Sequence, residues 1–368
     1  MNDTERVSVK AKDLRSFCGR VFRKCGVSAA DARVVADVLV AADLRGIPSH
    51  GVARLRAFYV RRLQDDVMNP RPDVRIVRET PVTALLDGGG GLGHPTACRA
   101  MTLAMQKARR TGVGFVTVRN SNHFGIAGYY AMMALDKGCI GLAMTTSNRW
   151  MVPTFGCDAR LGTNPIAVAV PSGTERPFVL DMATSAVTIG KLEVHERLGL
   201  PIPLQWATGA DGRASADPGA VMRDVRALTG GGLLPLGGAG EETGGHKGYG
   251  LAAWVDIFSA LLSGAPCSDR NSELDADGKA RPGDIGHFFG VWRVEAFRPL
   301  AEFRAEMDAW LRRLKAAPKA RSAERIYIAG EKEFEEADRR RRDGIPLPQT
   351  VRRDLRDLGR ELGVEPIA

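Results

Sequence analysis

Apolar positions recur with helical spacing at the start of the chain. Residues 29–44 carry them three and four apart, and Ser28 followed by Asp31 resembles a capping box, so a helix is predicted there. After the loop GIPSHG, the same spacing predicts a second helix over residues 52–63. The first 65 residues are therefore expected to be helical.

From residue 74 the pattern changes to short β-like runs separated by Gly, Pro and Asn turns. The runs are VRIV, VTALL, GFVTV, IGLAM, IAVAV, PFVL and, near residue 290, FFGVWRVEAF, and each predicts a strand. Helices are predicted over residues 96–110, 126–137 and 249–262. Residues 211–232 predict a long loop, and residues 267–284 an exposed polar insertion.

The chain returns to helical patterns near its end. Residues 300–315 predict an amphipathic helix, and the last 35 residues predict polar helices around the turn GIPLPQ. Because both ends are helical and the middle is mixed, we expect two domains. One is a discontinuous helical domain of residues 1–75 and 296–368, and the other is a mixed α/β domain of residues 76–295.

Composition narrows the class of protein. With 368 residues, 44% of them hydrophobic and 26% charged, the chain is expected to be soluble and globular, which excludes disorder, collagen and coiled coil. No apolar run reaches the 18–20 residues or so of a membrane span, and the first residues lack the apolar stretch of a secretion signal, so we expect a cytoplasmic protein. The dispersed six Cys and six His predict neither disulfides nor a metal site.

The net charge of +9 raises the question of an anionic partner. Arg is mixed with Asp and Glu along the predicted helices, and only residues 339–342 form an unbroken basic run. A solvated helical face explains that run, and 6% aromatic residues leave few platforms for stacking bases. We therefore expect no nucleic-acid partner. A non-catalytic basic protein that binds anions or nucleic acid stays as an alternative.

Two glycine-rich segments suggest nucleotide chemistry. Gly88, Gly90 and Gly93 have the GxGxxG spacing of a dinucleotide fingerprint between a predicted strand and helix, but the acidic residue expected about 20 positions later is missing. A plain turn is favoured, and a Rossmann dehydrogenase is the alternative. The segment GAGEETGGHKGYGL has P-loop spacing, but His246 replaces the Lys of that motif. It predicts an anion site at a helix start.

Polar clusters follow several predicted elements. His50 and Arg54 are four residues apart, which could place a proton donor beside a guanidinium that grips a carboxylate, although a surface His at a helix start explains the pair equally well. Asn122 and His123 follow a strand, as do TTSN, GTNP and DMATS, all of which could equally be capping or turn residues. Their recurrence after successive strands favours one shared ligand cleft.

Taken together, the chain resembles the type-2 malate/L-lactate dehydrogenase family of NAD(P)-dependent oxidoreductases. The segments that carry this resemblance run from position 42 to 333: ADLRGIPSHGVARL, VRNSNHFGIAGYYAMMAL, TTSN, LGTNPIAVAVP, FVLDMATSA, GGHKGYGL and ERIYIAGEKE. The resemblance implies an α+β fold that is not a Rossmann fold. A mostly antiparallel central sheet would bind the cofactor, helices from both chain ends would form a second domain, and the active site would lie at their interface.

The resemblance also implies the chemistry. Family members are typically homodimers that interconvert small 2-hydroxy acids and 2-keto acids, or reduce cyclic imines, with NAD or NADP. His50 and His123 match the family's proton-transferring positions, and Arg54 would hold the substrate carboxylate. Substrate contacts are expected from Ser49, Arg54, Asn122 and Thr163. Cofactor contacts are expected from Ser147, Asp181, Met182, Ala183, Lys247, Gly248, Gly330, Glu331 and Lys332. The family usually has Pro where Ala329 stands, so a looser loop is expected there.

Overall fold

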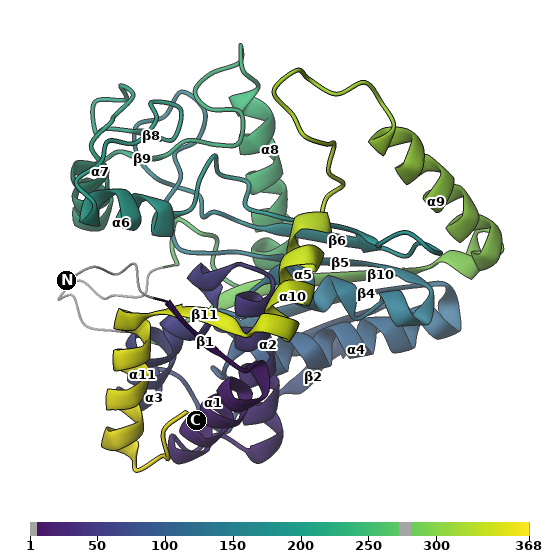
Figure 1. Cartoon of the computed structure of the whole chain (residues 1–368), viewed down its shortest axis with the longest axis horizontal. Helices are drawn as coiled ribbons and strands as arrows, with labels where there is room; N and C mark the ends of the chain where they lie inside the picture. Colours follow the sequence, from purple (N-terminus) through teal and green to yellow (C-terminus); the bar gives the residue numbers. More distant parts are fainter. Residues whose placement is uncertain (1–5, 272–280, 368) are drawn as a thin grey trace.

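A seven-stranded sheet forms the centre of the protein (Figure 1). The computed structural model describes residues 6–271 and 281–367. Only β3 and β4 are parallel, so the sheet is mostly antiparallel, which confirms the expected fold class. The strands lie in the order β2 (Arg75–Glu79), β3 (Thr83–Asp87), β4 (Val113–Ser121), β10 (Ile285–Arg293), β5 (Cys139–Thr145), β6 (Ile166–Val170) and β7 (Phe178–Met182).

Alternation along the strands separates the two faces of the sheet. In β5, Ala143 faces the core under α4 (Gly93–Thr111) and α5 (Ala127–Met132), whereas Leu142 and Met144 face the opposite side, under α8 (Gly245–Asp256). In β10, Phe289 likewise faces the core under α4 and α5, and Phe288 faces the side under α8. These strands read as almost continuous apolar runs because both of their faces are covered.

Elements from both ends of the chain share a separate core. It joins α1 (Ala11–Lys24) and α2 (Ala29–Leu44) to α10 (Glu331–Asp343) and α11 (Gln349–Leu362). A two-stranded ribbon, β1 (Arg6–Val9) with β11 (Ile345–Pro348), ties the termini together. Figure 1 shows α9 (Leu300–Lys315) apart from this group. The domain boundaries proposed above stay a prediction.

Three predicted segments have different local structure. Residues 52–63 form no single α-helix: the 3-10 turns η1 (Pro48–His50) and η2 (Val52–Arg54) lead into a π-helix, η3 (Leu55–Val60), and then α3 (Arg61–Gln64). The helix predicted over 126–137 divides into α5 and a 3-10 turn, η4 (Leu135–Lys137), and α8 continues into a second π-helix, η5 (Ile257–Leu261). Apolar spacing identifies the buried face of a helix. It does not distinguish an α-helix, whose hydrogen bonds join residues four apart, from a π-helix, whose hydrogen bonds join residues five apart.

A third core lies beside the sheet ends. It is built by α6 (Ile189–Arg197), α7 (Pro218–Ala227) and the short pair β8 (Ala207–Thr208) and β9 (Gly232–Leu233). The prediction of a loop over 211–232 was therefore wrong, because α7 lies within it. Its start has a clear signal, since Asp217 caps the N–H of Ala220 and Pro218 occupies the first turn.

The polar insertion is only partly as expected. Residues 272–280 lie outside the described residues, but Ser268 and Asn271 before them are buried. The Ser268 hydroxyl donates to Asp256 over 2.8 Å, which anchors this end of the insertion to α8. The prediction of exposure was wrong there, because a polar residue with a buried partner looks the same in sequence as a solvated one.

Charge on α10 is balanced locally. Arg339 and Arg340 both pair with Glu336, and Arg341 pairs with Asp338. Arg339, Arg341 and Arg342 are exposed, as expected of a solvated helical face, but the Arg340 side chain is only 11% exposed and also contacts the end of α2. Within residues 6–271 and 281–367 no helix is both long and apolar enough to cross a membrane, and no three metal-ligating side chains gather as a possible metal site.

Candidate active site

His50 and His123 meet although 73 positions separate them in the sequence. Their rings are stacked, with centroids 5.4 Å apart and planes inclined by 24°. Ser49 Oγ lies 2.9 Å from His50 Nδ1, and Arg54 Nε donates to the main-chain oxygen of Ser49 over 2.9 Å. The structure therefore brings four predicted site residues together, where the turns η1 and η2 approach the end of β4.

The turn that carries His50 is fixed by a buried carboxylate. Asp43, at the end of α2, accepts the Val52 N–H over 2.8 Å, and a Cβ on Gly51 would lie only 2.0 Å from its Oδ1. Arg340 donates to the main-chain oxygen of Asp43 over 2.6 Å. Because only glycine fits over the carboxylate, the glycine of the SHG sequence follows from the packing of the turn. Burial raises the pKa of Asp43 to about 7, against the opposing effects of the Val52 N–H and Arg340.

Both imidazoles are neutral at pH 7. Burial, with the nearby Arg54 charge, lowers the pKa of His50 to about 4. Burial also holds the pKa of His123 well below its usual range, and interactions with His50, His94 and Arg54 act in the same direction. A neutral imidazole can accept a proton, and an anion bound at Arg54 would offset one cause of the low pKa of His50.

A second group of predicted residues forms a chain of contacts at the ends of β5, β6 and β7. The Thr163 N–H donates to Ser147 Oγ over 2.8 Å, and the Thr184 N–H donates to the Thr163 oxygen over 2.9 Å. The Leu236 N–H donates to Thr184, and a Cβ on Gly248 would lie 2.2 Å from the Leu236 oxygen. Short residues here allow the strand ends and the start of α8 to approach closely. Met182 and Ala183 are partly exposed beside this network.

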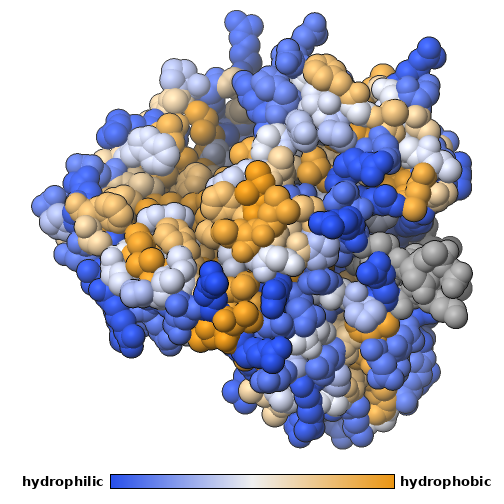
Figure 2. Space-filling model, turned by 180° about the vertical axis from the view of Figure 1, so that it is seen from behind, coloured by the Kyte–Doolittle hydropathy of each residue, from blue (hydrophilic) through white to orange (hydrophobic). Residues whose placement is uncertain are grey.

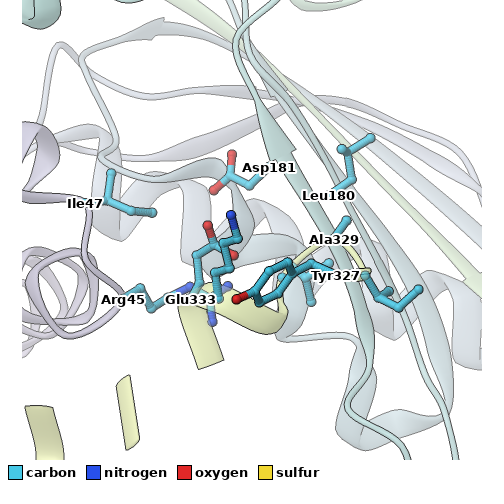
Figure 3. Close-up of a pocket in the computed structure, with 11 residues that line it drawn as sticks. Arg45, Ile47, Leu180, Asp181, Tyr327, Ala329 and Glu333 are labelled. Carbon is cyan, nitrogen blue, oxygen red and sulfur yellow. The ribbon is translucent and has the colours of Figure 1, made fainter. Parts of the chain in front are cut away.

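A pocket of about 280 Å³ opens between β7 and the segment after α9 (Figure 3). Three of its lining residues, Asp181, Gly330 and Lys332, are predicted cofactor contacts, and burial raises the pKa of Asp181 to about 6. Figure 3 shows Arg45 and Glu333 side by side, with Asp181 above them. Ile47, which directly precedes the turn that carries His50, also lines the pocket.

Other predicted contacts have structural partners. The Asn122 amide nitrogen donates to the oxygens of Gly90 and Gly91 over 3.0 and 2.9 Å. The Glu331 carboxylate pairs with Lys315 and accepts the Ile328 N–H. Lys247 lies in the first turn of α8, after the left-handed Gly244. None of these arrangements tests a ligand contact, so their roles stay predictions.

The GxGxxG glycines belong to a βαβ unit whose loop is filled by the protein itself. α4 connects the parallel strands β3 and β4, as in a dinucleotide-binding unit. However, a Cβ on Gly88 would lie 2.8 Å from the Asn120 oxygen, and one on Gly93 would lie 2.0 Å from the Asn122 oxygen. The close approach that glycine permits is thus used by other parts of this chain. A plain turn, as favoured above, accounts for the motif.

Three residues of the site were missed in the sequence. Tyr59 lies under His123, with Oη 2.6 Å from Nδ1. Asp43 holds the His50 turn, and Arg45 lines the pocket. Asp43 and Arg45 are both within the ADLRG segment, so their place beside SHG was a usable signal. The sequence around Tyr59 contained no such signal, because the position of its side chain depends on the π-helical turn.

Comparisons with known proteins agree with this geometry. Residues 9–356 match the sequence profile of the malate/L-lactate dehydrogenase family. The malate dehydrogenase of Pyrococcus abyssi is 45% identical over 364 residues, covering 99% of this chain and 97% of that protein. The L-sulfolactate dehydrogenase of Methanocaldococcus jannaschii is 37% identical, with 94% of each chain covered. The crystal structure of malate dehydrogenase from Entamoeba histolytica has a TM-score of 0.94 at 37% identity, covering 98% of this chain and 99% of that one.

Proposed function

The chain belongs to the malate/L-lactate dehydrogenase family, and on that premise we propose that it moves a hydride between NAD or NADP and a small carboxylate substrate. The substrate pair is a 2-hydroxy acid and its 2-keto acid, or a cyclic imine and its reduced form. The observation that supports this most strongly is the convergence of His50 and His123 beside Arg54. Proton exchange and carboxylate binding are the two tasks that such a reaction leaves to the protein.

The histidines and the arginine have separate roles in this proposal. The Arg54 guanidinium binds the substrate carboxylate, for which its planar fork is suited. In the oxidation direction a neutral imidazole takes the hydroxyl proton, and the low pKa values keep both rings ready for this at pH 7. In the reduction direction an imidazolium must deliver a proton to the developing alkoxide. The carboxylate on Arg54 favours that form, because it offsets the guanidinium charge beside His50.

The residues of the pocket and the strand ends fit a nicotinamide nucleotide. When bound, this cofactor supplies or accepts the hydride. Arg45 and Lys332 would face its phosphates, and the Asp181 carboxylate could accept from ribose hydroxyls. The pocket of about 280 Å³ would hold part of the cofactor, and Ser147, Thr163 and Gly248 at the strand ends would contact the rest of it.

We place the protein in the cytoplasm as a homodimer. All six cysteines are free thiols, which suits a reducing compartment. Exposed apolar side chains at Ile257, Leu261 and Leu262 favour contact with a second copy. Figure 2 shows apolar areas among polar ones on the face opposite to that of Figure 1. Sedimentation of the purified protein checks the dimer.

The test is turnover of a panel of 2-keto acids and cyclic imines with NADH and with NADPH. His50→Ala and His123→Ala should fold and lose about 10²- to 10⁴-fold in kcat, which is the usual contribution of general acid–base catalysis. Arg54→Ala should mainly raise KM for carboxylate substrates. His195→Ala and Arg56→Ala are matched controls, because His195, on α6, contacts the main-chain oxygen of Pro201 and Arg56 pairs with Asp354. Full activity in both active-site His variants would overturn the proposal.

A further inference from the structure

Tyr59 is a fully buried tyrosine whose hydroxyl lies against His123. Its Oη is 2.6 Å from His123 Nδ1, and its side chain has an exposure of 0%. It lies on η3, one of the π-helical turns that often occur at functional sites. Residues 50–59 therefore bring His50, Arg54 and Tyr59 to one place from a single short segment.

The surroundings leave one edge of the His123 ring for a reacting group. His50 is stacked on the ring, and Phe58 meets it edge-on with centroids 5.6 Å apart. The Nδ1 edge faces Tyr59 and the Gly125 N–H, which lies at 3.3 Å. In the described part of the chain Nε2 has no hydrogen bond, so Nε2 is the nitrogen that can exchange a proton with a substrate.

The two groups at Nδ1 act in opposite directions. A main-chain N–H can only donate, so the Gly125 N–H favours the His123 tautomer that carries its hydrogen on Nε2. In that tautomer Nε2 has no lone pair with which to accept a proton from substrate. A tyrosine hydroxyl can also accept. When Tyr59 accepts from Nδ1–H, the Nε2 lone pair is free, and the same contact stabilises the imidazolium formed when Nε2 takes a proton.

We infer that Tyr59 is a positioning residue that selects the proton-accepting tautomer of His123 and supports its protonated form. This inference rests on the proposed function and deepens it. The step it supports is balanced: the substrate O–H bond breaks as Nε2–H forms, while Nδ1–H stays on the ring and donates to Tyr59. Burial and the Arg54 charge disfavour a positive charge on His123, and protonation of His50, His94 or His287 would disfavour it further, whereas an accepting Tyr59 hydroxyl acts in the opposite direction.

The inference is tested with Tyr59→Phe, which removes one oxygen and keeps the ring. Tyr129→Phe is the matched control, since Tyr129 donates to Asp37 over 2.9 Å and also loses one hydrogen bond. In the oxidation direction Tyr59→Phe should lower kcat about 100-fold with KM changed less than about threefold. The control should keep kcat within about twofold. The pH at which reduction is half-maximal should also move downward in Tyr59→Phe, because the imidazolium has lost its acceptor.

A second readout does not depend on turnover. Nitrogen NMR of the protein labelled at histidine, with His123→Gln to assign the signal, reports which ring nitrogen carries the hydrogen. The wild type should show a population with hydrogen on Nδ1 that is lost in Tyr59→Phe and kept in Tyr129→Phe. An unchanged tautomer and pH profile in folded Tyr59→Phe would overturn the inference. Absence of any hydride transfer by the wild type would instead refute the proposed function.

Discussion

Gly51→Ala should disturb the active-site turn through a single collision. Gly51 has φ −92° and ψ −156°, which other residues also adopt, so backbone strain is not the cause. The added methyl carbon would lie 2.0, 2.3 and 2.4 Å from the Oδ1, Cγ and Oδ2 atoms of Asp43. Carbon contacts normally lie at roughly 3.5–4.0 Å, so the carboxylate or the turn must move by more than about 1 Å.

The expected loss of stability follows from two effects. Overpacking a filled site costs about 1–3 kcal/mol, and breaking the 2.8 Å hydrogen bond from Val52 to Asp43 costs about 1–3 kcal/mol more. We therefore expect Gly51→Ala to lower the free energy of unfolding by about 2–6 kcal/mol. Since His50 is the neighbouring residue, kcat/KM should fall as well. Gly19→Ala in α1 is the control, because nothing lies within 4 Å of its added carbon.

A double-mutant cycle isolates the collision. Asp43→Ala removes all three atoms that the new methyl group meets, so adding Gly51→Ala to it should cause little further loss of stability. Urea unfolding of the wild type, both single variants and the double variant gives the coupling, which we expect to be about 2 kcal/mol or more. If the two losses simply add to within about 0.5 kcal/mol, Asp43 is not what excludes a side chain at position 51.

Two further predictions concern protonation. Removing the charge in Arg54→Leu should raise the pKa of His50 from about 4 toward its usual value, because the guanidinium is one of the two causes of the low value; an NMR titration that finds no change would show burial alone to be responsible. Asp308 accepts the N–H groups of Gly173 and Thr174, and these bonds outweigh burial and lower its pKa to about 2. The stability that this carboxylate contributes is present above pH 3.8 and is lost as the pH falls toward 2. Between these pH values the free energy of unfolding in urea should therefore change less with pH in Asp308→Asn than in the wild type, and an equal change would contradict this.

Local patterns predicted the elements whose signals are themselves local. The spacing in residues 29–44 gave α2 with its Ser28 cap, and β-like runs gave the strands of the sheet. Alternation could not give the strand order. β10, more than 130 residues after β5 in the sequence, inserts between β4 and β5, and such pairing depends on contacts far apart along the chain. The ribbon of β1 and β11, from opposite ends of the chain, was missed for the same reason.

The candidate site was predictable where side-chain chemistry identifies a residue. His50, Arg54 and His123 were selected from their residue types and the segments around them, and they do lie together. Tyr59 was not found, because a π-helix shifts the direction of its side chain relative to an α-helix. Asn122 shows what sequence chemistry leaves out. Its amide nitrogen holds the glycine loop, a structural role that the sequence did not reveal, and its expected contact with substrate stays a prediction.

Direct transfer of hydrogen between cofactor and substrate is the central claim, and isotope labelling tests it most directly. The protein would be incubated with reduced nicotinamide cofactor carrying deuterium at C4 and with a 2-keto acid that it turns over. Mass spectrometry of the product should find the deuterium on the carbon that bears the new hydroxyl group, in wild type and, more slowly, in Tyr59→Phe. Product that carries only solvent hydrogen at that carbon would contradict the account.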